Sequence, residues 1–196
     1  MIAFIVKKIN IPLYDKIVHM KVKLYPFFNH WTNPVWLYSD PHFEDEDCKL
    51  MDSNWPDPLM QVKMINSKVG RLDTIVILGD IGNPRYLKDI RGHKVLVLGN
   101  HDKGSSNYSA YVDEIYEGPL FISPKILLSH EPIDIPFGIN IHGHNHSGEI
   151  INRQNDDSFD YNVCSNVINY TPVRLDEVFT LAKTSDIHRI TIDKIK

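Results

Sequence analysis

Short polar segments rich in histidine, aspartate and asparagine recur through the middle of this 196-residue chain. Their side chains are of the kinds that bind transition metals, because carboxylates and amides offer oxygen ligands and imidazoles offer nitrogen ligands. Such a mixed set suits manganese, iron, zinc, nickel or cobalt better than calcium or magnesium. The candidate metal ligands are Asp40, His42, Asp80, Asn100, His130, His144 and His146.

The charge of this set favours a phosphate group as the molecule that the metals would bind. Two divalent ions bring four positive charges, and the carboxylates of Asp40 and Asp80 cancel two of them. The remaining positive charge is available for a hydroxide and a phosphoryl oxygen. Two ions about 3.5–4 Å apart can hold a bridging hydroxide and clamp an in-line displacement at phosphorus. The residues therefore predict metal-dependent hydrolysis of a phosphoester.

Three of the polar segments directly follow short apolar runs, at residues 35–38, 74–78 and 94–98. Continuous apolar runs of this length predict strands that are buried on both faces. Open α/β sheets bind their ligands just beyond the carboxyl ends of such strands. The alternation of strands with helical patterns predicts an α/β fold. The expected helices between the strands are residues 58–69, 84–91 and 105–112.

Further strands and a helix are expected on either side of this central part of the chain. Residues 18–24 alternate between apolar and polar side chains, which is typical of a half-buried strand, and Asn33-Pro34 breaks the pattern. We expect a single domain over residues 1–196, in which residues 1–33 form an N-terminal extension or added edge strands. In the second half, strands are expected at residues 126–128, 139–141, 159–163 and 189–192, and a helix at residues 175–182.

Taken together, the polar segments resemble the signature of the calcineurin-like metallophosphoesterases, and in particular their small bacterial and phage-type members. The resemblance implies a four-layer sandwich of two mixed β-sheets flanked by helices. The segments stand in the family's order and span more than half of the chain. They read Asp40-x-His42, Gly79-Asp80, Gly99-Asn100-His101-Asp102, His130 and Gly143-His144-x-His146.

The resemblance also implies a role for each residue of the signature. Two divalent transition-metal ions would be bound, with manganese as the first choice and iron, zinc, nickel or cobalt as alternatives. Asp80 would bridge the ions, and Gly143 would let the backbone approach them. His101 would act as a general acid or hydrogen-bond donor near the leaving group, and Asp102 would orient it. The first ion would be held by Asp40, His42, Asp80 and His146, and the second by Asp80, Asn100, His130 and His144.

Two departures from the family's patterns concern the substrate. Similar small members often carry a second histidine shortly after the first motif, whereas acidic residues 44–47 follow Phe43 here. We therefore expect a more acidic rim. The protein serine/threonine phosphatases of this superfamily read Gly-Asp-x-x-Asp-Arg and Gly-Asn-His-Glu. This chain lacks the first pattern and ends the second in Asp102, which argues against that branch.

These residues predict a binuclear metal-dependent phosphoric ester hydrolase. Its substrate would be a phosphodiester or a nucleotide-like molecule, and the attacking group would be a hydroxide that bridges the ions. One alternative is a phosphomonoesterase or pyrophosphatase acting on nucleotides or phosphoprotein. The other is a non-catalytic scaffold with the same fold. Scaffolds can lose ligands, whereas this chain keeps all seven together with His101.

The amino-acid composition limits the cellular compartment and the kinds of partner that we expect. The formal net charge of -4 does not favour a general nucleic-acid-binding surface, and a local basic patch stays open. Two cysteines, Cys48 and Cys164, are too few for a disulfide framework. No stretch approaches the roughly 20 apolar residues that cross a bilayer. We expect a cytoplasmic protein that acts on a phosphoester small molecule or nucleotide and contacts no membrane; the oligomeric state is left open.

Several neighbouring residues are expected to have structural roles. His142 lies outside the ligand motif and favours packing or support of a ligand. Arg85 could meet phosphate, but surface cations of this kind are more often solvated. The tryptophans are expected to pack in the core or at the lip of the site; they are Trp31, Trp36 and Trp55.

Overall fold

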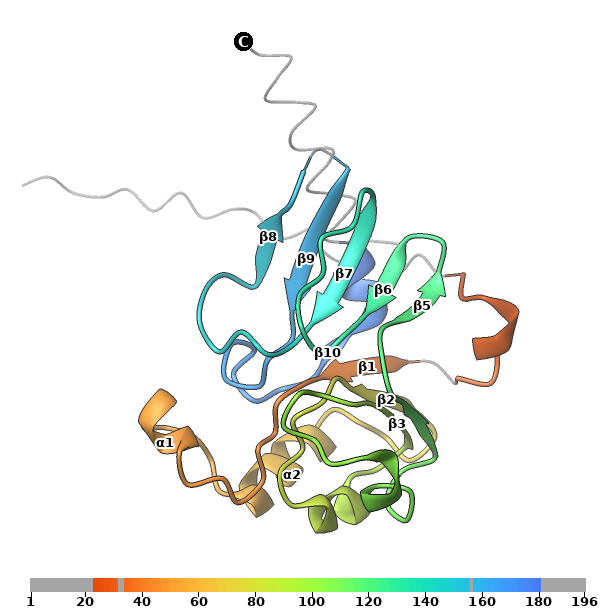
Figure 1. Cartoon of the computed structure of the whole chain (residues 1–196). Coiled ribbons are helices and arrows are strands. Elements are labelled where there is room, and N and C mark those ends of the chain that lie inside the picture. Colours follow the sequence, from red (N-terminus) through yellow and green to blue (C-terminus); the bar gives the residue numbers. More distant parts are fainter. Residues whose placement is uncertain (1–22, 32–33, 156, 181–196) are drawn as a thin grey trace, which may run out of the picture.

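The protein folds into two five-stranded sheets that pack against each other (Figure 1). The computed structural model describes residues 23–31, 34–155 and 157–180. The first sheet has the order β10 (Val173–Arg174), β1 (Val35–Tyr38), β2 (Thr74–Ile77), β3 (His93–Val97) and β4 (Glu114–Tyr116). The second has the order β5 (Leu120–Ser123), β6 (Ile126–Leu128), β7 (Gly138–His142), β9 (Ser158–Asn162) and β8 (Ile151–Arg153).

Both sheets are mixed, which confirms the predicted α/β fold of two mixed sheets. Strands β1 to β4 are parallel, and β10 pairs antiparallel with β1. In the second sheet β6, β7 and β9 are parallel, and the edge strands β5 and β8 are antiparallel to their neighbours. The parallel strands of each sheet therefore end at one common edge, where the loops can meet.

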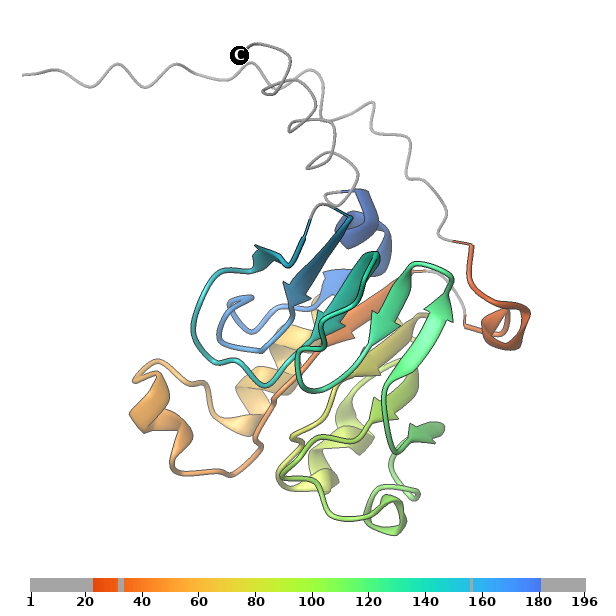
Figure 2. The same ribbon diagram turned by 45° about the horizontal axis from the view of Figure 1, so that its top comes forward.

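One apolar core joins the two sheets. Leu37 of β1 and Val76 of β2 belong to the same buried cluster as Leu128 of β6 and Ile141 of β7. Strand β2 is buried along its whole length, as expected for a parallel strand covered on both faces. Figure 2 shows the two sheets from a second direction, with their strands one layer above the other.

Short helices cover the outer faces. Helix α2 (Pro58–Asn66) begins after Asp57, whose side chain accepts a backbone N–H of the first turn. Its buried residues Val62 and Ile65 pack into the common core. Residues 175–180 are helical and lie beside the second sheet in both views. Among the described residues, no helix is long and apolar enough to cross a membrane.

The helices expected at residues 58–69, 84–91 and 105–112 are shorter than their patterns suggested, whereas the strands expected between residues 35 and 163 are confirmed to within one residue at each end. The segments expected at 84–91 and 105–112 form only the 3₁₀ turns η3 (Pro84–Asp89) and η4 (Ser105–Asn107). η4 buries none of its residues, so no packing supports a longer helix there. The acidic run instead leads into a single turn, α1 (Cys48–Met51).

The described part of the N-terminal segment packs onto the molecule through a short turn. Residues 18–22 and the strand expected at 189–192 lie outside the described residues. Residues 23 and 24 are not in a strand, and the turn η2 (Pro26–Phe28) follows. Phe28 and Trp31 are buried in the core, because their rings lie against each other at 4.8 Å and Phe28 lies beside Tyr116.

Candidate metal centre

The loops that follow β1 and β2 are joined by backbone hydrogen bonds. The amide of Asp40 donates to the carbonyl of Gly79 at 3.1 Å, and the amide of His42 donates to the carbonyl of Asp80 at 3.0 Å. The pairing of the two strands therefore continues past their carboxyl ends. As a result, three candidate ligands lie at one edge of the first sheet, where open α/β sheets bind their ligands.

Four of the seven candidate ligands have a left-handed backbone conformation. The φ angle is 54° at Asp40, 44° at His42, 53° at Asp80 and 65° at His144. Among the described residues, only three other non-glycine residues have a positive φ. Each such residue costs on the order of 1–3 kcal/mol, and strain of this kind clusters at binding and catalytic sites. The strain here is concentrated on the side chains that would bind metal.

One group of ligand atoms surrounds a carboxylate oxygen of Asp40. Asp40 Oδ1 lies 3.9 Å from His42 Nε2 and 3.6 Å from His146 Nε2. His42 Nε2 also lies 3.7 Å from Asp80 Oδ2. Asp40 Oδ1 and His42 Nε2 are buried and have no hydrogen-bond partner. Because a buried polar atom without a partner costs about 1–3 kcal/mol, a cation bound between these atoms would stabilise them.

A second group lies on the other side of Asp80. Asp80 Oδ2 lies 3.4 Å from His130 Nε2, which is 2.7 Å from Asn100 Oδ1. His144 Nδ1 lies 3.1 Å from Asn100 Oδ1 and 3.3 Å from His130 Nε2. The same oxygen of Asp80 therefore faces His42 in the first group and His130 in the second. That is the position of a bridging carboxylate.

The structure thus brings all seven candidate ligands together, divided into the two sets of four that the family resemblance implies. The two sets share only Asp80. The mixture of carboxylate, amide and imidazole atoms fits divalent transition metals. Metal binding by these residues stays a prediction at this point, and the arrangement is suited to it.

The imidazoles of two candidate ligands are held through their second ring nitrogen. His42 Nδ1 lies 3.3 Å from Asp45 Oδ2, and His130 Nδ1 lies 2.7 Å from the carbonyl oxygen of Leu78. Metal-binding histidines usually donate their other ring N–H to a carboxylate or carbonyl, which fixes the ring and its tautomer. The sequence gives little sign of these supports, apart from an acidic residue three positions after His42.

His146 has a support from the second sheet. Its Nδ1 lies 3.2 Å from Asn166 Oδ1 and 3.1 Å from Cys164 Sγ, and Asn166 Nδ2 donates to its carbonyl at 2.7 Å. Burial raises the pKa of the Cys164 thiol, so the sulfur is uncharged. Sequence reasoning assigned neither residue to the site, because no spacing rule connects them to His146. A β-bridge between Ser39 and Cys164 brings them there.

The two carboxylates each use one oxygen to hold a neighbouring loop. Asp40 Oδ2 accepts the backbone N–H of His144 at 2.9 Å. Asp80 Oδ1 accepts the backbone N–H of His101 at 3.0 Å. The other oxygen of each carboxylate is left facing the candidate ligands, so the same two residues position the loops and supply charge to the site.

Glycines allow the close approach of these loops. A Cβ atom on Gly143 would lie 1.9 Å from Ser39 Oγ and 2.2 Å from Asp40 Oδ2. A Cβ atom on Gly99 would lie 2.3 Å from Asp80 Oδ1. Gly143 therefore lets this backbone approach the candidate ligands, and its approach to bound ions stays a prediction.

Asp102 holds neighbouring loops, and its expected role in orienting His101 stays a prediction. Its carboxylate accepts the backbone N–H groups of Asp80, at 2.9 Å, and Gly99, at 2.8 Å, and the hydroxyl of Tyr108, at 2.9 Å. Among the described residues, no hydrogen bond or ion pair links it to the His101 ring. A carboxylate that receives several backbone donors is committed to holding loops, so Asp102 positions the loops after β2 and β3.

Two further histidines of the motifs lie outside both groups of ligands. His101 is exposed, and its ring centroid lies 6.1 Å from that of His42, which places it at the mouth of the centre. His142 is buried in β7, with Nδ1 2.7 Å from the Gly143 carbonyl oxygen and Nε2 3.9 Å from Asp160. His101 can therefore meet a substrate, whereas His142 has the structural role expected of it.

Burial and charge shift the titration of the candidate ligands in opposite directions. Burial lowers the pKa of His42. Burial also acts to lower the pKa of His130, but the carboxylates of Asp80 and Asp40 outweigh it and raise the pKa to about 9. The pKa of Asp80 is lowered, because His130 outweighs the opposite effect of burial. The carboxylates of Asp40 and Asp80 thus place negative charge beside the imidazoles of the centre.

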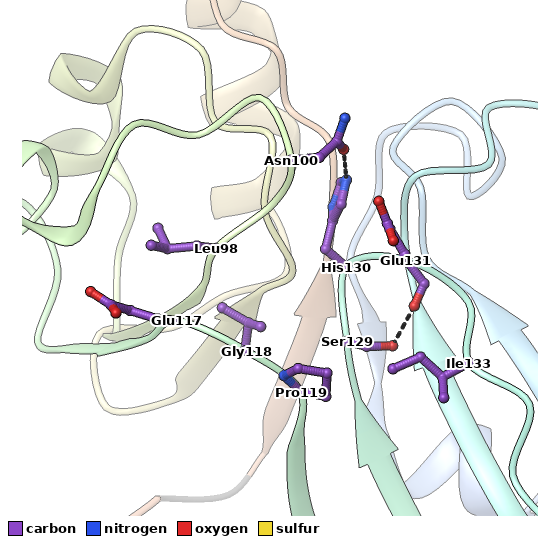
Figure 3. A pocket seen from close by; sticks show the side chains of 10 residues that line it. Leu98, Asn100, Glu117, Gly118, Pro119, Ser129, His130, Glu131 and Ile133 are labelled. Carbon is purple, nitrogen blue, oxygen red and sulfur yellow. Dashed lines mark hydrogen bonds between the residues drawn. The ribbon is translucent and has the colours of Figure 1, made fainter.

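Two hollows flank the centre. A hollow of about 210 Å³ is lined by Asn100 and His130, which meet between loops of the two sheets (Figure 3). A larger hollow of about 700 Å³ adjoins the first group and is lined by His42, Trp55 and Lys49. The acidic side chains that line the larger hollow are Glu44, Asp45, Glu46 and Asp57.

The rim of the larger hollow has the acidic character expected from the sequence. Glu44 binds the guanidinium of Arg85 and accepts the Tyr86 hydroxyl at 2.6 Å, and Arg85 lies over the Tyr86 ring at 4.8 Å. Arg85 is therefore already engaged within a surface network. Trp55 is buried at the lip, with its ring 6.0 Å from that of His42, as expected.

Comparisons with known proteins support the fold and leave the activity open. No protein-family profile matches the chain. An uncharacterized protein of Methanocaldococcus jannaschii is 27% identical over 179 residues, which cover 81% of this chain and 97% of that protein. The crystal structure of a protein of unknown function from Aquifex aeolicus is similar, with a TM-score of 0.62 and 25% identity, over 76% of this chain and 98% of that one.

Proposed function

We propose that this chain is a calcineurin-like metallophosphoesterase that hydrolyses a phosphodiester or nucleotide-like substrate with two divalent metal ions. One observation carries the proposal: two groups of ligand atoms share a single oxygen of Asp80, and buried atoms among them have no partner within the protein. Orphaned atoms of this kind are expected where an ion belongs. Manganese is the proposed metal, with iron, zinc, nickel or cobalt as alternatives.

Each residue of the centre has a chemical task in this proposal. When bound, the ions would supply a water of lowered pKa and positive charge for the phosphoryl oxygens. Asp80 would bind both ions through the oxygen that faces both groups. His101 would donate a proton or hydrogen bond to the leaving-group oxygen, because its exposed ring stands at the mouth. Its backbone is tied to Asp80, so its ring stays near the centre.

The two hollows favour a diester over a monoester. One adjoins His42 and the other adjoins Asn100 and His130, so the centre lies between them. A phosphodiester carries two substituents on its phosphorus, and each hollow can receive one. The larger hollow is lined by four carboxylates and Lys49. Such a lining repels a long polyanion, so it favours a small or nucleotide-like substrate over a nucleic-acid strand.

The proposal is tested by loading the protein with manganese and comparing bis(p-nitrophenyl) phosphate with p-nitrophenyl phosphate. We expect faster turnover of the diester and almost no turnover by Asp80→Asn, which keeps the size of the side chain but removes its charge. Asp89→Asn, at an exposed position of η3, is the matched control and should leave turnover unchanged.

The same experiment separates the alternatives. A strong preference for the monoester would replace the diester proposal with a phosphomonoesterase or pyrophosphatase. A protein that holds fewer than one tightly bound ion per chain and turns over neither ester would be a scaffold. Turnover that persists in Asp80→Asn would contradict the assignment of the bridging residue.

A further inference from the structure

A second cluster of metal-binding side chains lies at the opposite end of the first sheet. His93 begins β3 and Glu114 begins β4, so both stand at the amino-terminal edge of the sheet. Asn100, a candidate ligand of the centre, lies beyond the carboxyl end of the same strand β3. The strand alone separates the two places by more than about 13 Å, at about 3.3 Å per residue. The cluster is therefore separate from the centre described above.

One oxygen of Glu114 is the focus of this cluster. Glu114 Oε1 lies 2.7 Å from His30 Nε2 and 2.5 Å from His93 Nε2. The three ligand atoms all lie within 4.8 Å of one another. Two imidazole nitrogens and one carboxylate oxygen are a set that zinc uses, at about 2.0–2.2 Å from each atom. Rotation of the two partly exposed imidazole rings would open the space for an ion.

Two further side chains hold the carboxylate in place. Trp31 Nε1 donates to Glu114 Oε1 at 2.9 Å, and the Tyr116 hydroxyl donates to Glu114 Oε2 at 2.7 Å. Trp31 is buried, and Tyr116 packs against the ring of Phe28. Ligating carboxylates in metal sites are commonly held by hydrogen bonds of this kind. The cluster thus has three candidate ligands, and hydrogen bonds fix the position of Glu114 among them.

Access to the cluster is open on one side. The side chain of His30 is 49% exposed and that of His93 is 32% exposed, whereas that of Glu114 is 17% exposed. An ion can enter from the solvent, and water can complete its coordination. His30 belongs to the N-terminal segment that packs on the core, so an ion here would tie that segment to the edge of the first sheet.

We propose that His30, His93 and Glu114 form a separate zinc site that fastens the N-terminal segment to the sheet. The proposal does not depend on the phosphoesterase function, because its ligands and its place in the fold are different. The proposal concerns binding of the ion alone and assigns the site no catalytic role.

The test is the zinc content of the full chain after equilibrium dialysis against a low concentration of zinc. We expect His30→Ala to hold one zinc fewer per chain than the unmodified protein. His30 is half-exposed, so this variant keeps the fold. Tyr116→Phe removes a support and should weaken binding of that same zinc by about 10–100-fold. Glu117→Gln, an exposed glutamate three residues along, is the control and should keep the full zinc content.

Hydrolysis of phosphoesters is measured in parallel to keep the two proposals distinct. Loss of one zinc in His30→Ala with unchanged hydrolysis supports a separate site. Equal zinc content in His30→Ala, Glu114→Gln and the unmodified protein would overturn the proposal, and the histidines would then be simple hydrogen-bonding partners of Glu114. Lack of hydrolysis in every variant, including the unmodified protein, would count against the phosphoesterase proposal and leave the zinc site unaffected.

Discussion

The evidence for metal binding is strongest at residues whose buried polar atoms have no hydrogen-bond partner in the protein. Asp40 Oδ1 and His42 Nε2 are such atoms, and they lie 3.9 Å apart. Folding alone gives no reason to bury them together, because each loses hydrogen bonds to water. Binding of a cation does give a reason. A few buried atoms that face a shared space are therefore the strongest sign of a metal site.

His101 is the residue whose task can be separated from metal binding. His101→Ala should leave the metal content unchanged, because the ring lies outside both groups of candidate ligands. It should lower kcat by about 10²–10⁴, the usual range for a general acid. Metal analysis and steady-state kinetics on the same preparation check both parts. Loss of metal in this variant would show that His101 has been assigned wrongly.

The residues of the signature could be read from the sequence because their types and spacing are chemically specific. The supports of the histidines could not. Leu78 acts through its backbone carbonyl, which any residue would provide, and Asn166 and Cys164 reach His146 only through the packing of the second sheet. The loop contacts of Asp102 could not be predicted either, because its sequence position beside His101 says nothing about which backbone amides it meets.

At the scale of elements, the centre depends on loops that approach more closely than side chains normally allow. Gly143→Ala would place a Cβ atom 1.9 Å from Ser39 Oγ and 2.2 Å from Asp40 Oδ2. We expect the loop after β7 to move and the metal content and diesterase activity to fall by at least about tenfold, as for the loss of a support of a metal ligand.

Gly104→Ala is the matched control, because a Cβ atom there meets nothing within 4 Å. Metal analysis and circular dichroism of both variants distinguish a damaged centre from a damaged fold. Full metal content in Gly143→Ala would mean that close approach of this loop is not required.

The turn at α1 provides a prediction on pH. The hydroxyl of Tyr170 donates to Asp52 Oδ2 at 2.5 Å and, with the backbone N–H of Asn54, lowers the pKa of Asp52 below 3.8 in the folded protein. A carboxyl with a lowered folded-state pKa stabilises the fold above its unfolded pKa, and this contribution is lost as the pH falls through the folded value.

Tyr170→Phe should therefore lower the free energy of unfolding at pH 7 by less than about 1 kcal/mol, since Asp52 is only partly buried and solvent screens its charge. The difference between variant and unmodified protein should shrink as the pH is lowered below 3.8. Urea unfolding at several pH values measures it. A difference that stays constant with pH would show that the hydroxyl does not stabilise the ionised form of Asp52, because the variant keeps the ring that packs against Trp55 at 5.4 Å.

The strands were predicted more closely than the helices for a physical reason. A buried parallel strand needs a continuous apolar run, and β1, β2 and β3 have one. The segments 84–91 and 105–112 offer breaking residues and polar side chains but too little apolar surface to support a full helix. Strand β4 escaped prediction because its residues Glu114, Ile115 and Tyr116 are only half-buried at a sheet edge.

At the scale of the whole molecule, the centre joins the two sheets. Asp40, His42, Asp80 and Asn100 follow strands of the first sheet, whereas His130 and the histidines after β7 come from the second. Bound ions would therefore stabilise the packing of the sheets as well as the loops. This coupling makes the stability of the fold a readout of metal binding.

Manganese should raise the melting temperature of the protein. At a free concentration of 100 times the Kd, a ligand that binds only the folded state contributes about 2.7 kcal/mol. For a domain of this size that amounts to roughly 5–10 °C. Asp80→Asn should show a much smaller increase in differential scanning calorimetry. Equal melting temperatures with and without manganese, zinc or cobalt would contradict a metal site between the sheets.

The central claim is that seven side chains hold two metal ions that share Asp80. Anomalous X-ray diffraction from crystals grown with manganese tests it most directly. We expect two anomalous peaks about 3.5–4 Å apart. One should lie among Asp40, His42 and His146, the other among Asn100, His130 and His144, and Asp80 should lie between them. Absence of both peaks from this place, in a crystal whose soaking solution contains manganese well above micromolar concentration, would contradict the claim.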